Sequence, residues 1–390
     1  MRTSVGIIGA GPAGLLLAHL LRQAGIDNVV LENRTRAYVE HRQRAGVLEQ
    51  NTVDVLRASG AGERMDRVGL RHDGIELRFA REAHRVDFPT RTGGRSVMVY
   101  AQTEVVKDLI QLAQQRDGRV LFEAEAFAIE HTETLRPVIR YRHEGAEHAL
   151  ECDVVAACDG FHGIGRRSVP PGRLNTYERE YPFAWLGILA DVPPSCDELI
   201  YANHERGFAL HSMRSPHVSR LYLQVAPDED LNAWPDERIW AELDTRFELP
   251  GWRLERGRIT EKGITPMRSF VAEPLRHGRL FLVGDAAHIV PPTGAKGLNL
   301  AAADATLLAA AIIRAHDKGD ESLLDAYSDT ALRRVWRAEH FSYFMTTMLH
   351  RDPRQDEFAH RLQLSNLHYI AASDAAAASL AENYVGLPVV

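Results

Sequence analysis

The chain opens with two short, mostly apolar runs that flank a helical pattern. Residues 5–8 and 29–32 lack polar alternation, which is typical of parallel strands buried on both faces. Between them, leucines at 15, 16, 17, 20 and 21 follow helical spacing, and the pattern stops at Gly25. The sequence therefore predicts a strand–turn–helix–strand unit, the start of a doubly wound sheet.

The pattern changes twice further along. From about residue 173 to 268, polar and apolar residues alternate, as in 208–214 and 220–225, which predicts an antiparallel sheet. On either side lie further buried strands and helices. The strands are expected near Val120 and Val138 and at 152–160 and 279–285, and the helices at 102–115, 297–318, 321–349 and about 371–380.

These elements predict an α/β protein, with a Rossmann-type domain interrupted by an antiparallel-sheet domain. The dinucleotide-binding domain is assigned to 1–72, 99–172 and 269–318. The substrate domain is assigned to 73–98 and 173–268, and a C-terminal helical, interface-forming region to 319–390.

Composition narrows the function classes. The net charge of −7 lacks the basic footprint of a nucleic-acid binder. Three cysteines without a close pair fit neither a disulfide framework nor a zinc site and suggest a reducing compartment. The longest apolar stretch, 298–313, contains Asp304 and is shorter than a bilayer span of about 20 residues. The first strand starts too early for a secretion signal. We expect a cytoplasmic enzyme without a membrane segment.

Glycines in the first turn have the G-x-G-x-x-G spacing. Gly9 permits the tight turn, Gly11 lets a pyrophosphate approach the backbone, and Gly14, after Ala13, allows close helix–strand packing. The helix then directs free N–H groups at the phosphates. Glu32, at the end of the next strand, is suited to bind a ribose diol.

Two more turns extend this pattern. Asp159-Gly160 and Gly284-Asp285 each follow a buried strand. A glycine-rich turn, then Asp-Gly, then Gly-Asp resembles the flavoprotein monooxygenases, which bind FAD and reduce it with a pyridine nucleotide. The resemblance implies that Asp285 binds the ribityl chain and that Asp159 lies near the pyrophosphates. In the segment 284–299 it places Lys296, Gly297, Leu298 and Asn299 beside the flavin ring, with the helix that starts near Gly297 stabilising negative charge on the ring.

Six short segments resemble the aromatic hydroxylases of this family that act on 4-hydroxybenzoate. They are residues 44–50, 201–204, 212–214, 220–222 and 382–388, together with the loop around Pro292. The resemblance implies hydroxylation at position 3 with O2. A buried carboxylate must be paired, and Arg214 suits this through its planar fork, with hydroxyl donors from Ser212 and Tyr222. The resemblance places the Pro292 carbonyl at the substrate hydroxyl and includes Thr293 among the substrate-binding residues.

The same resemblance implies a route for the phenol proton. Tyr201 contacts the phenol oxygen, Tyr384 contacts Tyr201, and His72 connects the chain to solvent. A phenolate activates its ortho carbon better than a phenol, whose pKa is about 10. Histidine titrates close to neutral pH and suits the end of such a chain. Arg44, Gln102 and Arg220 are expected at the flavin.

The nicotinamide nucleotide lacks a second glycine fingerprint and is expected on a surface cleft. The resemblance places Arg42, Arg44, Phe161, His162 and Arg268 near its diphosphate. Asn33, Arg34 and Tyr38 lie where a 2′-phosphate is read, and the stretch 33–38 favours NADPH, with NADH left open.

Two alternatives remain at this point. One is a related flavin hydroxylase of an aminobenzoate or another hydroxybenzoate. The other is a flavin-binding sensor that hydroxylates nothing. The resemblance also implies a homodimer, formed through the C-terminal helices.

Overall fold

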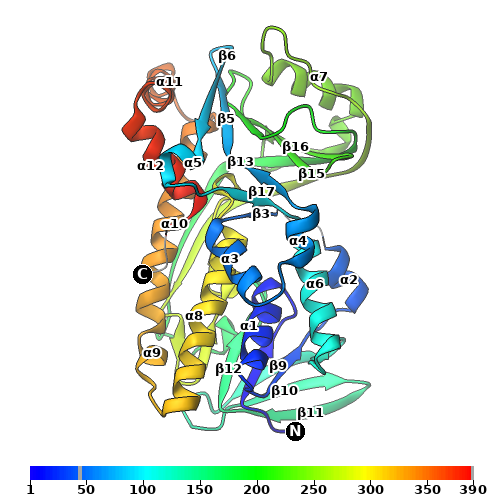
Figure 1. Cartoon of the computed structure of the whole chain (residues 1–390), viewed down its shortest axis with the longest axis vertical. Helices are drawn as coiled ribbons and strands as arrows, with labels where there is room; N and C mark the ends of the chain where they lie inside the picture. Colours follow the sequence, from blue (N-terminus) through cyan, green and yellow to red (C-terminus); the bar gives the residue numbers. More distant parts are fainter. Residues whose placement is uncertain (43–45, 388–390) are drawn as a thin grey trace.

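The computed structural model describes residues 1–42 and 46–387 (Figure 1). A six-stranded sheet occupies the lower half of the view and an eight-stranded sheet the upper half, while the long helices α8 and α10 run beside each other along the molecule. The α/β fold class predicted from the sequence is confirmed.

The six-stranded sheet has the order β18-β19-β12-β1-β2-β8. Its strands are β18 Arg276–His277, β19 Leu280–Leu282, β12 Val154–Ala157, β1 Val5–Ile8, β2 Asn28–Leu31 and β8 Arg119–Leu121. All neighbours are parallel except β18 and β19. The chain order reverses direction between β1 and β12, and doubly wound sheets bind ligands at this switch point. The predicted first unit is therefore confirmed.

Three helices pack against this sheet or one another: α1 Pro12–Gln23, α6 Gln102–Gln115 and α8 Gly297–Lys318. By length and composition alone, helix α8 could cross a membrane, although the apolar stretch 298–313 within it was too short by itself. Of its most apolar 18-residue stretch, 61% is buried inside the fold, and Leu300, Ala305 and Leu308 belong to buried cores. It is therefore a core helix of this domain.

The eight-stranded sheet has the order β20-β17-β13-β16-β15-β14-β5-β6. Its strands are β20 His288–Ile289, β17 Arg258–Glu273, β13 Asn175–Asp191, β16 Val218–Val225, β15 Ala209–Ser215, β14 Leu199–Ala202, β5 Gly74–Phe79 and β6 Glu82–Asp87. Neighbouring residues alternate between two cores, because successive side chains of a strand point to opposite faces. Tyr201 and Leu210 belong to one core, and Ile200 and Ala209 to the other. The predicted antiparallel pattern holds for most of this sheet, although β14 and β5 are parallel.

Smaller elements complete the fold. Two three-stranded sheets contain β9 Glu125–Glu130, β10 Val138–His143 and β11 Ala146–Glu151, and β3 Val47–Leu48, β7 Val97–Val99 and β4 Leu70–His72. The remaining helices are α2 Arg36–His41, α3 Gln50–Ala58, α4 Glu63–Val68, α5 Phe88–Thr92, α7 Asp236–Arg246, α9 Ser322–Asp325, α10 Tyr327–Leu349, α11 Glu357–Ala372 and α12 Asp374–Val385.

The predicted helix at about 371–380 is wrong in its bounds. Two helices meet there, because Ser373 ends α11 and its hydroxyl accepts the Ala376 N–H as the N-cap of α12. The helices α10 and α12 share a core with the eight-stranded sheet, and the same sheet lines the cavity described below.

Candidate active site

Three glycine turns that are far apart in the sequence meet at the switch point. Gly9 has φ +102°, and a Cβ on it would lie 2.4 Å from the Cys158 carbonyl oxygen. Gly284 has φ +63°, and its Cβ would lie 3.6 Å from the Cβ of Ala13. The G-x-G-x-x-G, Asp-Gly and Gly-Asp motifs therefore form one site, as their order in the sequence suggested.

The first turn has the free space that a pyrophosphate requires. A Cβ on Gly11 would meet no described atom within 4 Å, whereas one on Gly14 would lie 2.0 Å from the Gly9 carbonyl oxygen. Gly14 is thus needed for packing and Gly11 for open access to the backbone. Helix α1 begins here without a side-chain cap, so its first amides face this opening. The residues fit a bound dinucleotide.

Two of the three acidic residues of these motifs, Glu32 and Asp159, are held by backbone amides. Glu32 accepts the Ala10 N–H at 2.8 Å through Oε2 and the Arg34 N–H at 2.9 Å through Oε1. Each oxygen keeps a second lone pair, which can accept from a ribose hydroxyl. Asp159 accepts the Gly165 N–H at 2.8 Å, its Oδ1 is buried without a partner among the described residues, and burial raises its pKa. Asp285 lies in the short turn Gly284–Ala286 and is partly exposed.

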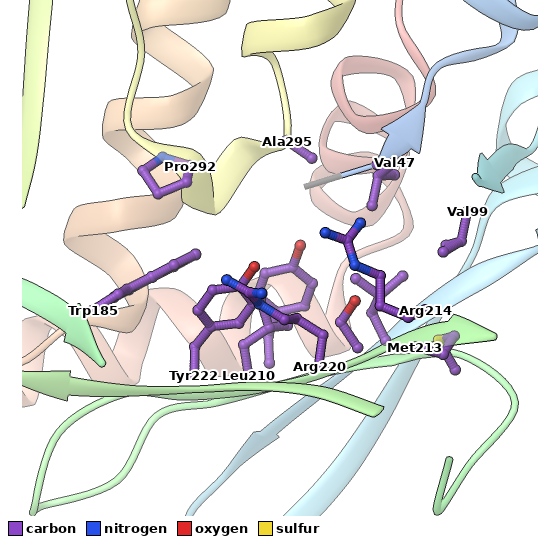
Figure 2. Close-up of a pocket in the computed structure, with 14 residues that line it drawn as sticks. Val47, Val99, Trp185, Leu210, Met213, Arg214, Arg220, Tyr222, Pro292 and Ala295 are labelled. Carbon is purple, nitrogen blue, oxygen red and sulfur yellow. The ribbon is translucent and has the colours of Figure 1, made fainter. Parts of the chain in front are cut away.

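A cavity opens where the eight-stranded sheet faces the loop after β20 (Figure 2). Its empty volume, counted together with the open space at its mouth, is about 470 Å³. The lining residues come from four strands of that sheet, from β3 and β7, and from the loop. They are Gly46, Val47, Val99, Trp185, Leu199, Tyr201, Leu210, Ser212, Met213, Arg214, Arg220, Tyr222, Pro292 and Ala295.

The cavity carries positive charge and, among the described residues that line it, no acid. Burial lowers the pKa of Arg214, and the nearby Arg220 lowers it further, although the Tyr222 hydroxyl opposes this. The guanidinium of Arg220 lies 5.3 Å from the centre of the Tyr222 ring, and its Nε has no hydrogen-bond partner among the described residues. An anionic ligand would offset the cost of burying two cations here.

Alternate residues of β15 point into the cavity. Leu210, Ser212 and Arg214 are two residues apart along the strand, and all three line the cavity, because every second side chain of a strand lies on the same face. Figure 2 shows Arg214 extending from the strand toward Val47. The register of β15 against β16 shifts between Met213 and Ser215, and at this β-bulge Met213 lines the cavity as well. The two polar residues predicted from the alternation of this segment therefore share the cavity.

Two tyrosines form a buried pair at this cavity. The hydroxyl of Tyr201 lies 2.6 Å from that of Tyr384, and both side chains are about 1% exposed. Burial raises the pKa of each well above its usual value, so both stay protonated at neutral pH. The predicted contact between them is present.

His72 is buried, contrary to the expected link to solvent. It is 1% exposed, and neither ring nitrogen has a hydrogen-bond partner in the described part of the chain. The reason is that His72 lies in β4 and pairs with Val97 of β7. Burial lowers its pKa to about 4, which keeps the ring neutral at neutral pH.

The loop after β20 exposes Pro292 and Ala295 to the cavity, but Thr293 points elsewhere. Thr293 is fully buried, does not line the cavity, and accepts a hydrogen bond from Thr346 at 3.0 Å. The predicted contact of its side chain with substrate is therefore not seen.

Below this loop, Lys296 and Asn299 join a polar cluster that the sequence did not reveal. The Lys296 ammonium donates to Glu49, and burial lowers its pKa. Asn299 accepts the Glu49 N–H and the Thr52 hydroxyl, each at 2.8 Å, and donates to two carbonyls. Both side chains support the start of α8. The helix begins with Gly297 and Leu298, and no side chain caps its N-terminus.

Comparison with known proteins decides the family. A sequence model described as FAD binding domain matches residues 2–342. The p-hydroxybenzoate hydroxylase of Acinetobacter baylyi is 49% identical over 389 residues, covering 100% of this chain and 96% of that enzyme. The chain belongs to the p-hydroxybenzoate hydroxylase family.

More distant matches support the fold. The solved structure of p-nitrophenol 4-monooxygenase from Pseudomonas putida DLL-E4 has a TM-score of 0.86 at 18% identity and covers 100% of both chains. The dialkyldecalin synthase of Streptomyces rugosporus is 28% identical and covers 84% of this chain and 69% of that protein. The predictions of an FAD-binding protein and of a flavin-dependent aromatic hydroxylase are confirmed by the family.

The residues expected at the nicotinamide nucleotide form two surface groups. In the first, Arg34 stacks over Tyr38 at 5.2 Å and Asn33 and Arg42 are exposed. In the second, Arg268 lies 5.0 Å from the Phe161 ring, and His162 is exposed beside it. Gln102, expected at the flavin, is the partly buried first residue of α6. Arg44 lies outside the described residues.

Sequence reasoning missed several residues at this site. Among them, Trp185 and Leu210 line the cavity, and Glu49 pairs with Lys296. Trp185 lies on the alternating strand β13, and Glu49 lies inside the motif 44–50, so pattern and resemblance each contained a signal.

Proposed function

We propose that this protein is a 4-hydroxybenzoate 3-monooxygenase. It converts 4-hydroxybenzoate, O2, NAD(P)H and a proton to 3,4-dihydroxybenzoate, water and NAD(P)+. The observation that carries the proposal is one cavity with two arginines, no acid among its described lining, and the Tyr201–Tyr384 pair. The name of the Acinetobacter relative supports the same substrate.

The two polar ends of the cavity are spaced for a para-substituted ring. Tyr201 pairs with Leu210, and Arg214 is four residues further along the same strand β15. At about 3.3 Å per residue along β15 and about 4.8 Å between the two strands, their backbones are at most roughly 14 Å apart. Their long side chains close much of that gap, which leaves room for one benzoate between them. Arg214, Ser212 and Tyr222 bind the carboxylate, and Tyr201 binds the phenol oxygen.

The tyrosines then favour the reactive form of the substrate. Because burial keeps Tyr201 and Tyr384 protonated, Tyr201 can donate to a phenolate while Tyr384 donates to Tyr201. The positive charges of Arg214 and Arg220 stabilise the same anion. The Pro292 carbonyl lies beside the substrate ring. His72 has no hydrogen-bond partner among the described residues. It can therefore receive the phenol proton from the tyrosine pair only through a bridging water or a movement of its own side chain.

FAD, when bound, accepts a hydride from the nicotinamide and activates O2 for transfer to the ring. Its pyrophosphate is held at Gly9, Gly11, Ala13 and Gly14, its ribose by Glu32, and its remaining polar groups by Gln102, Asp159 and Asp285. Arg44, Arg220 and the segment 296–299 support the flavin ring. Asn33, Arg34, Tyr38, Arg42, Arg44, Phe161, His162 and Arg268 bind the nicotinamide nucleotide.

The domain division proposed is that predicted above, with 1–72, 99–172 and 269–318 binding FAD, 73–98 and 173–268 binding substrate, and 319–390 at the interface. The pairing of β5 with β14 supports joining 73–98 to the substrate domain.

A homodimer is proposed through α11. Phe358, Leu362 and Tyr369 are 57–71% exposed and lie on one face of that helix, which leaves an apolar stripe without a partner. The odd, unpaired cysteines support a cytoplasmic location.

The test is NAD(P)H oxidation by the purified, FAD-loaded protein, with and without 4-hydroxybenzoate and with product identification. The proposal predicts strong stimulation and nearly one 3,4-dihydroxybenzoate per NAD(P)H. Preferential turnover of another benzoate would favour the related hydroxylase. FAD binding without aromatic stimulation would favour the sensor.

A further inference from the structure

Trp185, which forms one wall of the cavity, is fixed by a buried histidine. Its indole Nε1–H donates to Nε2 of His350 at 2.7 Å. The other ring nitrogen, Nδ1, lies 2.9 Å from the Thr346 carbonyl oxygen. Because a carbonyl only accepts, Nδ1 must carry the proton and Nε2 must be the acceptor. The geometry thus specifies one neutral tautomer of His350.

Aromatic rings enclose this histidine. His350 stacks on Phe208 at 4.2 Å and on Phe183 at 4.6 Å between ring centres, and its side chain is 1% exposed. Burial lowers the pKa of His350 to about 3, so the ring remains a hydrogen-bond acceptor throughout the neutral range.

The bonded network reaches the cavity on two sides. The Trp185 ring lies 4.6 Å from that of Tyr222, which also lines the cavity (Figure 2). The Thr346 hydroxyl, one turn before His350 on α10, donates to Thr293 next to Pro292. The C-terminal end of α10 therefore contacts both a wall of the cavity and the loop above it.

We propose that His350 is a positioning residue that fixes the rotamer of Trp185 and so sets the space for the aromatic ring of the substrate. The inference rests on the proposed function for the identity of that substrate. With the indole N–H bonded to His350, Trp185 presents apolar atoms to the cavity. Without that acceptor, the buried N–H is unsatisfied, and the ring gains by turning toward another acceptor.

The test compares two replacements of His350. His350→Gln keeps an acceptor near the position of Nε2, whereas His350→Leu keeps volume but no acceptor. In FAD-saturated protein, His350→Leu should raise the Kd for 4-hydroxybenzoate about tenfold and lower the product formed per NAD(P)H, since a buried polar group is left unpaired. His350→Gln should stay within about threefold of the wild type. FAD affinity should be unchanged in both.

A double-mutant cycle separates positioning from simple packing. Trp185→Phe removes the N–H, so adding His350→Leu in that background should change the Kd by less than about twofold. An equal effect in both backgrounds, or equal losses in His350→Gln and His350→Leu, would overturn the proposal. If His350→Leu does not retain FAD, His350→Met takes its place with the same expectations. A wild-type protein without hydroxylase activity would refute the proposed function. If the wild type is active and His350→Leu has the same Kd and the same product yield per NAD(P)H, only the positioning role is refuted.

Discussion

Replacing Arg214 by lysine tests the carboxylate clamp. Arg214 lines the cavity from strand β15, and its guanidinium can bind both oxygens of a carboxylate in parallel. Lysine retains the charge on a flexible stem but presents a point charge in place of the planar fork. The substitution therefore removes the paired, parallel hydrogen bonds of the guanidinium while it keeps the positive charge.

The size of the effect follows from the hydrogen bond that is lost. A hydrogen bond to a charged group contributes about 1.5–3 kcal/mol. Losing one of the two parallel bonds, at about 2 kcal/mol, should raise the Kd for 4-hydroxybenzoate about 30-fold. Removing the hydroxyl donor to the carboxylate in Ser212→Ala should cost about 1.5 kcal/mol, or roughly 12-fold in Kd, because a hydroxyl is a weaker donor than the guanidinium.

The assay is titration of the oxidised, FAD-bound protein with ligand, followed by the change in flavin absorbance. Phenol is the matched control ligand, because it lacks the carboxylate and should bind wild type and Arg214→Lys equally. An unchanged Kd for 4-hydroxybenzoate, or an equal loss for phenol, would refute the clamp.

Three further substitutions test other parts of the structure. Gly11→Ala should weaken FAD binding at least tenfold, as measured by FAD titration, but should leave the free energy of unfolding of the FAD-free protein unchanged, because no described atom lies near the new Cβ. Gly263→Ala is the control: its Cβ would be equally free of contacts, and neither quantity should change. Arg34→Gln should raise the KM for NADPH about fivefold more than the KM for NADH in steady-state assays. Arg36 is paired with Glu40 at 2.6 Å, so Arg36→Gln should change the KM for both nucleotides alike. Equal changes of the two KM values in Arg34→Gln would show that Arg34 does not bind the 2′-phosphate. Burial raises the pKa of Glu339 from 4.5 to about 7, so the folded state binds the proton more tightly and stability falls as the pH rises through this window. Glu339→Gln should therefore be more stable than the wild type by roughly 2–3 kcal/mol at pH 8 and nearly equal to it at about pH 4 in urea unfolding, and no difference between the two pH values would contradict this.

The sequence predicted most clearly the elements whose pattern is complete over a short range. Helices α6 and α8 begin and end where expected, since apolar spacing and terminal glycines define them locally. Helices α7 and α11 were missed. Helix α7 is short, and its three core residues, Ile239, Trp240 and Leu243, stand among charged residues, whereas α11 buries only Leu367 and Ile370.

The site shows the same division between local and distant information. Motif spacing predicted the turns at Gly9, Asp159 and Gly284, because each follows a strand of the same parallel sheet. The burial of His72 depends on pairing with β7, and the hydrogen bond of Trp185 depends on His350, which is 165 residues away. Such contacts are set by tertiary packing and leave no periodic signal in the chain.

The central claim is that the cavity binds 4-hydroxybenzoate as an anion at both ends, with Tyr201 at the phenol oxygen. Ultraviolet titration of the ligand bound to the oxidised protein measures this directly. The pKa of the bound phenol should fall at least one unit below its free value of about 10, and should return toward that value in Tyr201→Phe. A bound phenol that ionises at the same pH as in water, or equally in Tyr201→Phe and wild type, would contradict the account.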